Sequence, residues 1–159
     1  MRTFSFYKSL LLAFIVAGTL DIASAILLNL KVPIERIMRY IASGVFGKAA
    51  FTAGKEMIWY GLLFHYLIAY AWAATWFILY PTFKKYLQNK FITGIVFGLM
   101  TWLIMNFLVI PMSNTSKPKT GLSLYGVATG LGALIICIGI PVALIANWFY
   151  YGNRKVRKT

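Results

Sequence analysis

The sequence predicts an all-α protein: a four-transmembrane-helix bundle with an amphipathic, interfacial helix between spans one and two. Its 60% apolar and 12% charged residues depart far from the averages of soluble domains. Four apolar stretches reach the length of about 20 residues that a bilayer crossing requires. We therefore expect a single integral membrane domain over residues 1–159, with spans at about 10–30, 58–80, 91–110 and 122–150, an interfacial segment at 31–56 and a basic C-terminal tail at 151–159.

The first span has an alternative interpretation as a secretory signal. Arg2 and Lys8 precede its apolar core, and Ala23-Ser24-Ala25 resembles a small-residue cleavage site. The apolar run nevertheless continues to Leu30, beyond that site. We therefore favour a retained transmembrane helix.

The segment at 31–56 carries too much charge to span a bilayer. Pro33 suits the first position of a helix, and Ile34, Ile37, Met38 and Ile41 fall on the side opposite Glu35, Arg36 and Arg39. Glycines then interrupt residues 44–56, which leaves two interpretations open. This part either rests among the lipid headgroups or dips into the bundle as a re-entrant lid over a polar cavity.

The fourth span is longer than one crossing needs. Tilt, a further helical turn beyond the membrane, or a bend at Pro141 would absorb the surplus. The net charge of +13 is distributed around the spans, so we assign it to anionic lipid headgroups and expect no nucleic-acid partner. The positive clusters place both termini in the cytoplasm and predict these headgroup contacts: Lys84, Lys85, Arg154, Lys155, Arg157 and Lys158.

Small residues recur at helical spacing in all four spans, and such rows allow helices to pack closely. The predicted packing positions are Ala13, Ala17, Ala25, Gly61, Ala69, Ala73, Gly94, Gly98, Gly126 and Gly130. They serve contacts either within one chain or with a second copy or another membrane subunit.

Two titratable side chains lie within these rows. Asp21 is the only carboxylate in the spans, and His65 is the only histidine of the chain. At about 1.5 Å per residue, both lie roughly 10 to 14 Å from the outer ends of their spans. Asn106, Tyr125 and Thr129 fall in the same leaflet, so we predict an intramembrane polar centre of five residues: Asp21, His65, Asn106, Tyr125 and Thr129.

The polar centre has a structural and a functional interpretation. Structurally, Asp21 hydrogen-bonds Ser24, Asn106 or His65 and fixes helix register. Functionally, Asp21 and His65 form a proton-sensitive pair that binds or relays a cation.

The sequence contains no nucleophile elbow, phosphate loop or metalloprotease motif, and we expect no enzyme activity. His65 as a haem ligand lacks a second ligand at matching depth, and the single cysteine, Cys137, builds neither a disulfide framework nor a cysteine metal site. We expect no cofactor and no metal.

Several segments resemble the YagU-like family of small bacterial inner-membrane proteins of unsettled activity. They are Asp21-Ile22-Ala23-Ser24-Ala25, Arg39 to Gly44 with Gly47 and Ala50-Phe51, Phe64-His65-Tyr66, Met105-Asn106-Phe107 and Pro111-Met112-Ser113. The resemblance covers about the first 115 residues and includes Asp21, His65 and Asn106. It implies a four-helix protein of the bacterial inner (cytoplasmic) membrane.

Two functional hypotheses follow. In the first, this multi-pass membrane protein binds or conducts a proton or small cation through the Asp21 and His65 centre. In the second, it is a non-catalytic membrane partner or assembly subunit whose small-residue helix faces dock other chains.

Overall fold

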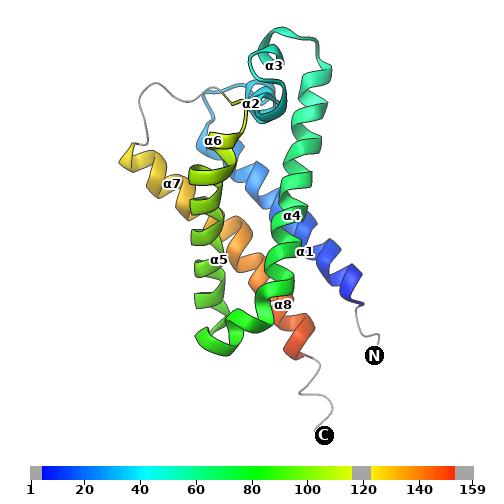
Figure 1. The fold of residues 1–159 in the computed structure, drawn as a ribbon, viewed down its shortest axis with the longest axis vertical. Coiled ribbons are helices and arrows are strands. Elements are labelled where there is room, and N and C mark those ends of the chain that lie inside the picture. Colours follow the sequence, from blue (N-terminus) through cyan, green and yellow to red (C-terminus); the bar gives the residue numbers. More distant parts are fainter. Residues whose placement is uncertain (1–4, 116–122, 153–159) are drawn as a thin grey trace, which may run out of the picture.

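The computed structural model describes residues 5–115 and 123–152, and over these ranges the chain is helical, with no strand. Within them, four helices are long and apolar enough to cross a membrane, as predicted. They are α1 (Phe6–Leu28), α4 (Glu56–Leu87), the run Lys90–Met112 and the run Leu124–Tyr151. Two shorter helices, α2 (Ile34–Phe46) and α3 (Ala49–Thr52), connect α1 to α4 and lie across one end of the bundle (Figure 1).

The second span ends later than the predicted residue 80. Helix α4 continues through Pro81 to Leu87, so Lys84 and Lys85 belong to its last turn rather than to a connecting loop. Cations at this position complement the partial negative charge of a helix C-terminus. The turn itself needs only two residues, Gln88 with a left-handed φ of 54° and Asn89.

The third and fourth spans each contain one wide, π-helical turn before a proline. In the third, α5 (Lys90–Ile104) passes through η1 (Met105–Val109) to α6 (Ile110–Met112). In the fourth, α7 (Leu124–Leu134) passes through η2 (Ile135–Gly139) to α8 (Ile140–Tyr151). Pro111 and Pro141 are the second residues of α6 and α8, and a proline lacks the amide donor that a regular ladder requires. The wide turns absorb that defect without ending the helices.

An aromatic core holds the helices together away from α2. Trp76, Phe77 and Tyr80 of α4 and Phe97 of α5 are at most 1% exposed. Trp76 and Phe97 stack with their ring centroids 4.6 Å apart. The Trp76 indole N–H donates to Thr101 Oγ1 over 2.7 Å, and the Tyr80 hydroxyl donates to Asn147 Oδ1 over 2.9 Å. The polar atoms of these large side chains are thus satisfied across helices.

Most of the predicted small-residue positions pack within the chain. Seven of them are buried: Ala13, Ala17, Gly61, Ala69, Ala73, Gly94 and Gly98. A β-carbon at Gly98 would clash with the backbone of Ile135, and one at Gly94 would lie 2.8 Å from the Cα of Ile140. At these two glycines the main chain of α5 therefore packs directly against η2 and the start of α8.

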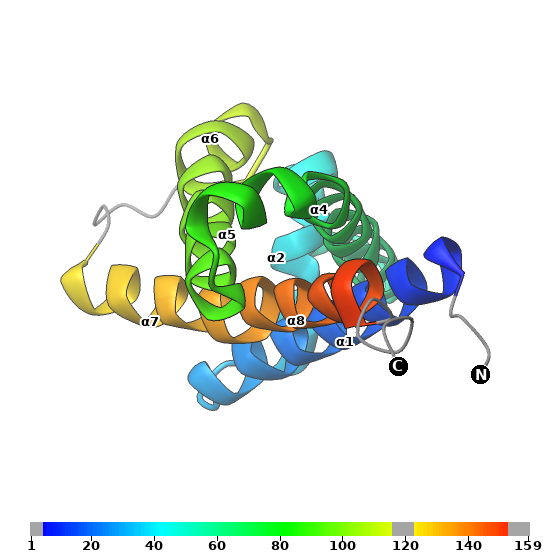
Figure 2. The ribbon, with the colours of Figure 1, turned by 90° about the horizontal axis from the view of Figure 1, so that it is seen from below.

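Three of the predicted packing positions are not buried. Ala25 is half-buried near the end of α1, and Gly130 is half-buried beside the Trp102 ring. Gly126 is exposed, and a β-carbon there would approach only Ser123 next to its own helix. The reason is geometric: α7 projects beyond the other helices (Figures 1 and 2), so its first turns have no neighbour within the described part of the chain.

Helix α2 is attached directly to α4. Gly61 of α4 faces the main chain of Met38, and a β-carbon at Gly61 would clash with the Met38 carbonyl. Gly61, Met38, Ala42 and Ser43 are all buried at this contact. Helix α2 therefore rests at a fixed position over the end of α4 and forms the cover of the site below.

Candidate functional site

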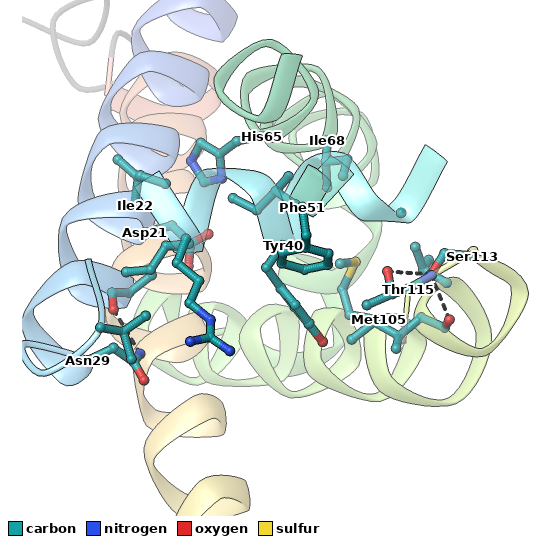
Figure 3. A pocket seen from close by; sticks show the side chains of 18 residues that line it. Asp21, Ile22, Asn29, Tyr40, Phe51, His65, Ile68, Met105, Ser113 and Thr115 are labelled. Atoms are coloured by element: carbon teal, nitrogen blue, oxygen red, sulfur yellow. Dashed lines mark hydrogen bonds between the residues drawn. The ribbon is translucent and has the colours of Figure 1, made fainter. Parts of the chain in front are cut away.

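A cavity of about 610 Å³ lies beneath α2, bounded by α1, α4, η1 and the chain that follows α6 (Figure 3). Most of its wall is apolar, and the aliphatic part includes Ile22, Ile37, Ile41, Ile68, Val109 and Ile110. The polar side chains of its wall are Asp21, Asn29, Arg36, Tyr40, His65, Ser113 and Thr115. Because Asn29, Arg36 and Tyr40 are exposed, the cavity is open on the side of α2.

His65 joins α4 to α1 at the edge of this cavity. Its ring is buried, and Nε2 lies 2.8 Å from the carbonyl oxygen of Gly18. A carbonyl oxygen only accepts, so Nε2 carries the hydrogen and donates it. The neutral ring is therefore held in the Nε2–H tautomer, and Nδ1 is the nitrogen that can take up a further proton.

Asp21 lies one helical turn beyond Gly18 on α1 and lines the same cavity as His65 (Figure 3). His65 is near enough for its charge to act on the Asp21 carboxyl group. Ser24 donates to the main-chain oxygen of Asp21 and not to its carboxyl group. Within residues 5–115 and 123–152, the Asp21 carboxyl group makes no hydrogen bond and no ion pair, and it lines the cavity.

The two arginines of α2 have different environments. Arg39 donates from Nε to Glu35 Oε1 over 3.0 Å and from Nη1 to the carbonyl oxygens of Ala50 and Ala53 over 2.9 Å each. It thereby ties α3 to α2. Arg36, one turn earlier, lines the cavity, and its guanidinium group has no hydrogen bond or ion pair within the described residues.

The opposite wall is held by the chain that follows α6. The Asn114 amide N–H and side chain donate to the carbonyl oxygens of Gly44 and Val45 over 2.9 and 2.8 Å. Ser113 donates to Thr115 Oγ1 over 2.9 Å. These bonds connect the end of the third span to the C-terminus of α2. Both segments thereby form part of the cavity wall.

The structure does not bring Asn106, Tyr125 and Thr129 to Asp21 and His65, and the five-residue centre is corrected to two. Asn106 donates its side-chain N–H to the carbonyl oxygen of Trp102, one turn back on its own helix, over 2.9 Å. Thr129 bonds in the same way to Tyr125, and Tyr125 is 76% exposed on the projecting α7. Short polar side chains in helices find such local carbonyl partners, and depth alone does not bring them together.

Five polar residues of the cavity wall are not among the site residues predicted from the sequence: Asn29, Arg36, Tyr40, Ser113 and Thr115. The helical period of residues 34–41 places Arg36 on the charged face of the surface helix together with Arg39. The period of the helix separates its two faces but does not distinguish an arginine over a cavity from one engaged by its neighbours. The sequence left open a lid over a polar cavity at residues 44–56, whereas in the structure α2 supplies Arg36 and Tyr40 to the cavity wall.

The predicted headgroup residues are only partly within the described chain. Lys84 donates to the carbonyl oxygen of Gln88, and the Lys85 ammonium lies 5.9 Å from the centre of the Tyr86 ring. Arg154, Lys155, Arg157 and Lys158 lie outside the described residues. Across the two described ranges, no three His, Cys, Asp or Glu side chains come together as a potential metal-binding group.

No family model, curated protein or solved structure matches this chain, and the resemblance to the YagU-like family stays a prediction. The architecture is that of four apolar helices consistent with a multi-pass membrane protein, with a cavity beside Asp21 and His65 that is open on the side of α2.

Proposed function

We propose that the protein is a non-enzymatic membrane protein that binds a small cation, in exchange with a proton, at Asp21 and His65. One observation carries the proposal: the Asp21 carboxyl group lines an open cavity between apolar helices and makes no hydrogen bond or ion pair within the described residues. An unpaired carboxylate among transmembrane helices is costly unless it takes up a proton or a cation.

The neighbouring histidine supplies the proton dependence. Because Nε2–H is engaged with Gly18, a proton added to His65 enters at Nδ1. The resulting positive charge lies near the same Asp21 carboxyl group that attracts the cation. A proton and a cation therefore compete for one negative charge, which is the elementary form of coupling between two ligands.

The geometry favours binding at one end of the bundle over a continuous pore. Beyond the cavity, Trp76, Phe77, Tyr80 and Phe97 fill the centre at near-zero exposure. A cation crossing the bundle would have to displace this aromatic layer. Conduction would therefore require helix movement, whereas binding requires none.

Proton release on cation binding tests the proposal. The purified protein in nanodiscs is titrated with methylammonium, sodium and potassium chloride at constant ionic strength, and a pH indicator dye reports released protons. We expect release with at least one cation and its loss in Asp21→Asn. Glu56→Gln, which removes an exposed carboxyl group at the start of α4, is the control and should leave release unchanged. Equal release by the unsubstituted protein and Asp21→Asn contradicts the proposal.

The same comparison in proteoliposomes tests transport. A pH-sensitive dye inside the vesicles records proton movement when a cation gradient is imposed. Proton movement that depends on Asp21 would show that cation binding is coupled to transport. If no protons move, the function is limited to binding.

We also propose that both termini lie in the cytoplasm of a bacterial cell, in its inner membrane, and that the cavity faces outward. The support is the clustering of Lys84 and Lys85 at the end of α4, together with the basic tail. Reporter fusions at the C-terminus test this: green fluorescence and inactive alkaline phosphatase are expected, and the reverse pattern contradicts it.

A second candidate function is assembly with another membrane chain, because α7 contributes no buried residue and leaves Leu124 and Tyr125 86% and 76% exposed. Native mass measurement in lipid decides it. A monomer that binds cations favours the first candidate, and a stable oligomer disrupted by Leu124→Ser favours the second.

A further inference from the structure

We infer that the cation bound at Asp21 is the primary ammonium group of a zwitterionic amphiphile whose phosphate pairs with Arg36. This rests on the proposed cation site and names its ligand class, the aminoethyl phosphate group. The juxtaposition behind it is one cavity of about 610 Å³ lined by Asp21 of α1 and Arg36 of α2, whose charged groups make no hydrogen bond or ion pair within the described residues.

The cavity is too large and too apolar for a bare metal ion. Calcium takes 6 to 8 oxygen ligands, whereas Asp21 is the only carboxylate among the described residues of this wall. Pockets of several hundred Å³, with mostly apolar walls and a few polar groups, are typical of organic ligands. An organic cation whose remaining atoms contact Ile37, Ile68 and Val109 uses the whole cavity.

Arg36 distinguishes a zwitterion from a simple amine. The guanidinium group of Arg39 is used internally by Glu35, Ala50 and Ala53, so its place in the fold is explained. Arg36 has no such partner within the described residues, yet it lines the cavity wall. Guanidinium groups bind phosphate oxygens in a forked geometry, so a phosphate next to the ammonium group matches the second charge of the cavity.

The acceptors around Asp21 favour a primary ammonium over a quaternary one. A primary ammonium donates three hydrogen bonds, the two Asp21 oxygens are acceptors at this end of the cavity, and His65, which also lines it, keeps Nδ1 unused by its bond to Gly18. A trimethylammonium group donates none. The rings of Tyr40 and Phe51 also line the cavity (Figure 3), and aromatic faces attract either cation. Selectivity for a primary over a quaternary ammonium group therefore comes from Asp21 and His65.

The aminoethyl phosphate group has two sources, the headgroup of phosphatidylethanolamine and free phosphoethanolamine. Both carry the ammonium and phosphate groups that Asp21 and Arg36 would bind. The lipid adds acyl chains that extend between helices, and the free compound is confined to the cavity. Competition between the two identifies the source.

The experiment compares lipids bound to the full chain by native mass spectrometry from mixed nanodiscs. Three lipids are offered in equal amounts: phosphatidylethanolamine, phosphatidylcholine, which lacks ammonium hydrogens, and phosphatidylglycerol, which lacks the cation. We expect about tenfold retention of phosphatidylethanolamine over each of the others by the unsubstituted protein. This comparison needs no variant and is independent of how any variant folds.

Three substitutions then assign the contacts. Asp21→Asn and Arg36→Gln should each abolish the preference, with helicity and elution unchanged. Lys48→Gln, which removes an exposed cation from the same connecting segment outside the cavity wall, should retain it. A preference that survives Arg36→Gln, or an equal retention of the three lipids, overturns the inference.

Soluble ligands separate this inference from the proposed function. Free phosphoethanolamine that displaces the lipid supports a site for the headgroup alone, and failure to displace supports a site that also needs the acyl chains. If methylammonium releases protons in an Asp21-dependent way but no lipid is preferred, the proposed cation site is supported and the inference of a zwitterionic ligand is contradicted. Absence of both effects overturns both.

Discussion

The imidazole of His65 on α4 donates its Nε2–H to the main-chain carbonyl oxygen of Gly18 on α1, over 2.8 Å and across 47 residues of sequence. The bond lies one turn from Asp21, so the same contact that joins the two helices sets the tautomer of the titratable ring beside the cavity. Close approach at this crossing depends on Gly18, where a β-carbon would lie 3.1 Å from Ala69.

Loss of that hydrogen bond should destabilise the crossing of α1 and α4. His65→Phe keeps a ring but removes the donor, and we expect a loss of about 0.5–2 kcal/mol in the free energy of unfolding. Tyr66→Phe is the control, because the Tyr66 hydroxyl lies 3.1 Å from Thr19 at an exposed part of the same crossing. Unfolding by sodium dodecyl sulfate in mixed micelles measures both, and an equal effect of the two would contradict a special role for the buried bond.

The packing of α2 against α4 should be disrupted by a single methyl group added at Gly61. In Gly61→Ala the added carbon clashes with the Met38 carbonyl, which is main chain and cannot rotate away. We expect a loss of about 1–3 kcal/mol and weaker ligand binding, because α2 must move from the cavity it covers. Gly132→Ala has nothing within 4 Å of the added carbon and serves as the control. Unchanged unfolding of Gly61→Ala would show that α2 is not held there.

The aromatic core should depend on one hydroxyl group. Thr101→Val keeps the shape but leaves the buried Trp76 N–H without its 2.7 Å acceptor. The expected cost is about 1–3 kcal/mol. Thr101→Ser restores the acceptor and should recover most of that loss in the same unfolding measurement. A serine variant no more stable than the valine variant would assign the effect to packing instead.

Arg39 should control the mobility of α3. Its guanidinium group spans Glu35, Ala50 and Ala53, a geometry that a lysine cannot reproduce. In Arg39→Lys we expect amide hydrogen exchange at residues 49–53 to become about tenfold faster. Arg36→Gln should leave exchange there unchanged, because Arg36 makes none of these bonds. Faster exchange in both variants would contradict the division of roles between the two arginines.

Alkaline pH should destabilise the fold partly through Tyr40. Tyr40 is 43% exposed, but partial burial at the cavity wall raises the pKa of its hydroxyl group above the ordinary value of 10.0, so the unfolded chain loses this proton first. Stability from this group is therefore intact below pH 10 and falls as the pH rises toward the folded-state pKa. The difference in unfolding free energy between Tyr40→Phe and the unsubstituted protein should be constant below that pH and shift in favour of the variant above it. Parallel curves at all pH values would contradict the expectation.

The rows of small residues predict helix packing correctly at some positions and not at others. Ala13, Ala17, Ala69 and Ala73 are buried as their spacing indicates, because the period of a helix places them on one face whatever that face meets. Gly126 has the same spacing to Gly130 but is exposed, since α7 leaves the bundle. The spacing of small residues predicts which face of a helix they share. The path of the helix through the bundle determines whether another helix packs against that face.

The sequence by itself determined the four apolar helices and the two titratable positions within them, because hydrophobic length and the placing of Asp21 and His65 are properties of each segment alone. Only the tertiary structure decided which polar groups meet. Asn106 and Thr129 turn to carbonyl oxygens of their own helices, whereas Arg36 and Tyr40, from the surface helix, join Asp21 at one cavity. The physical reason is that such meetings depend on how helices rotate and cross. Backbone contacts such as Gly61 with Met38, made between residues distant in sequence, set those crossings.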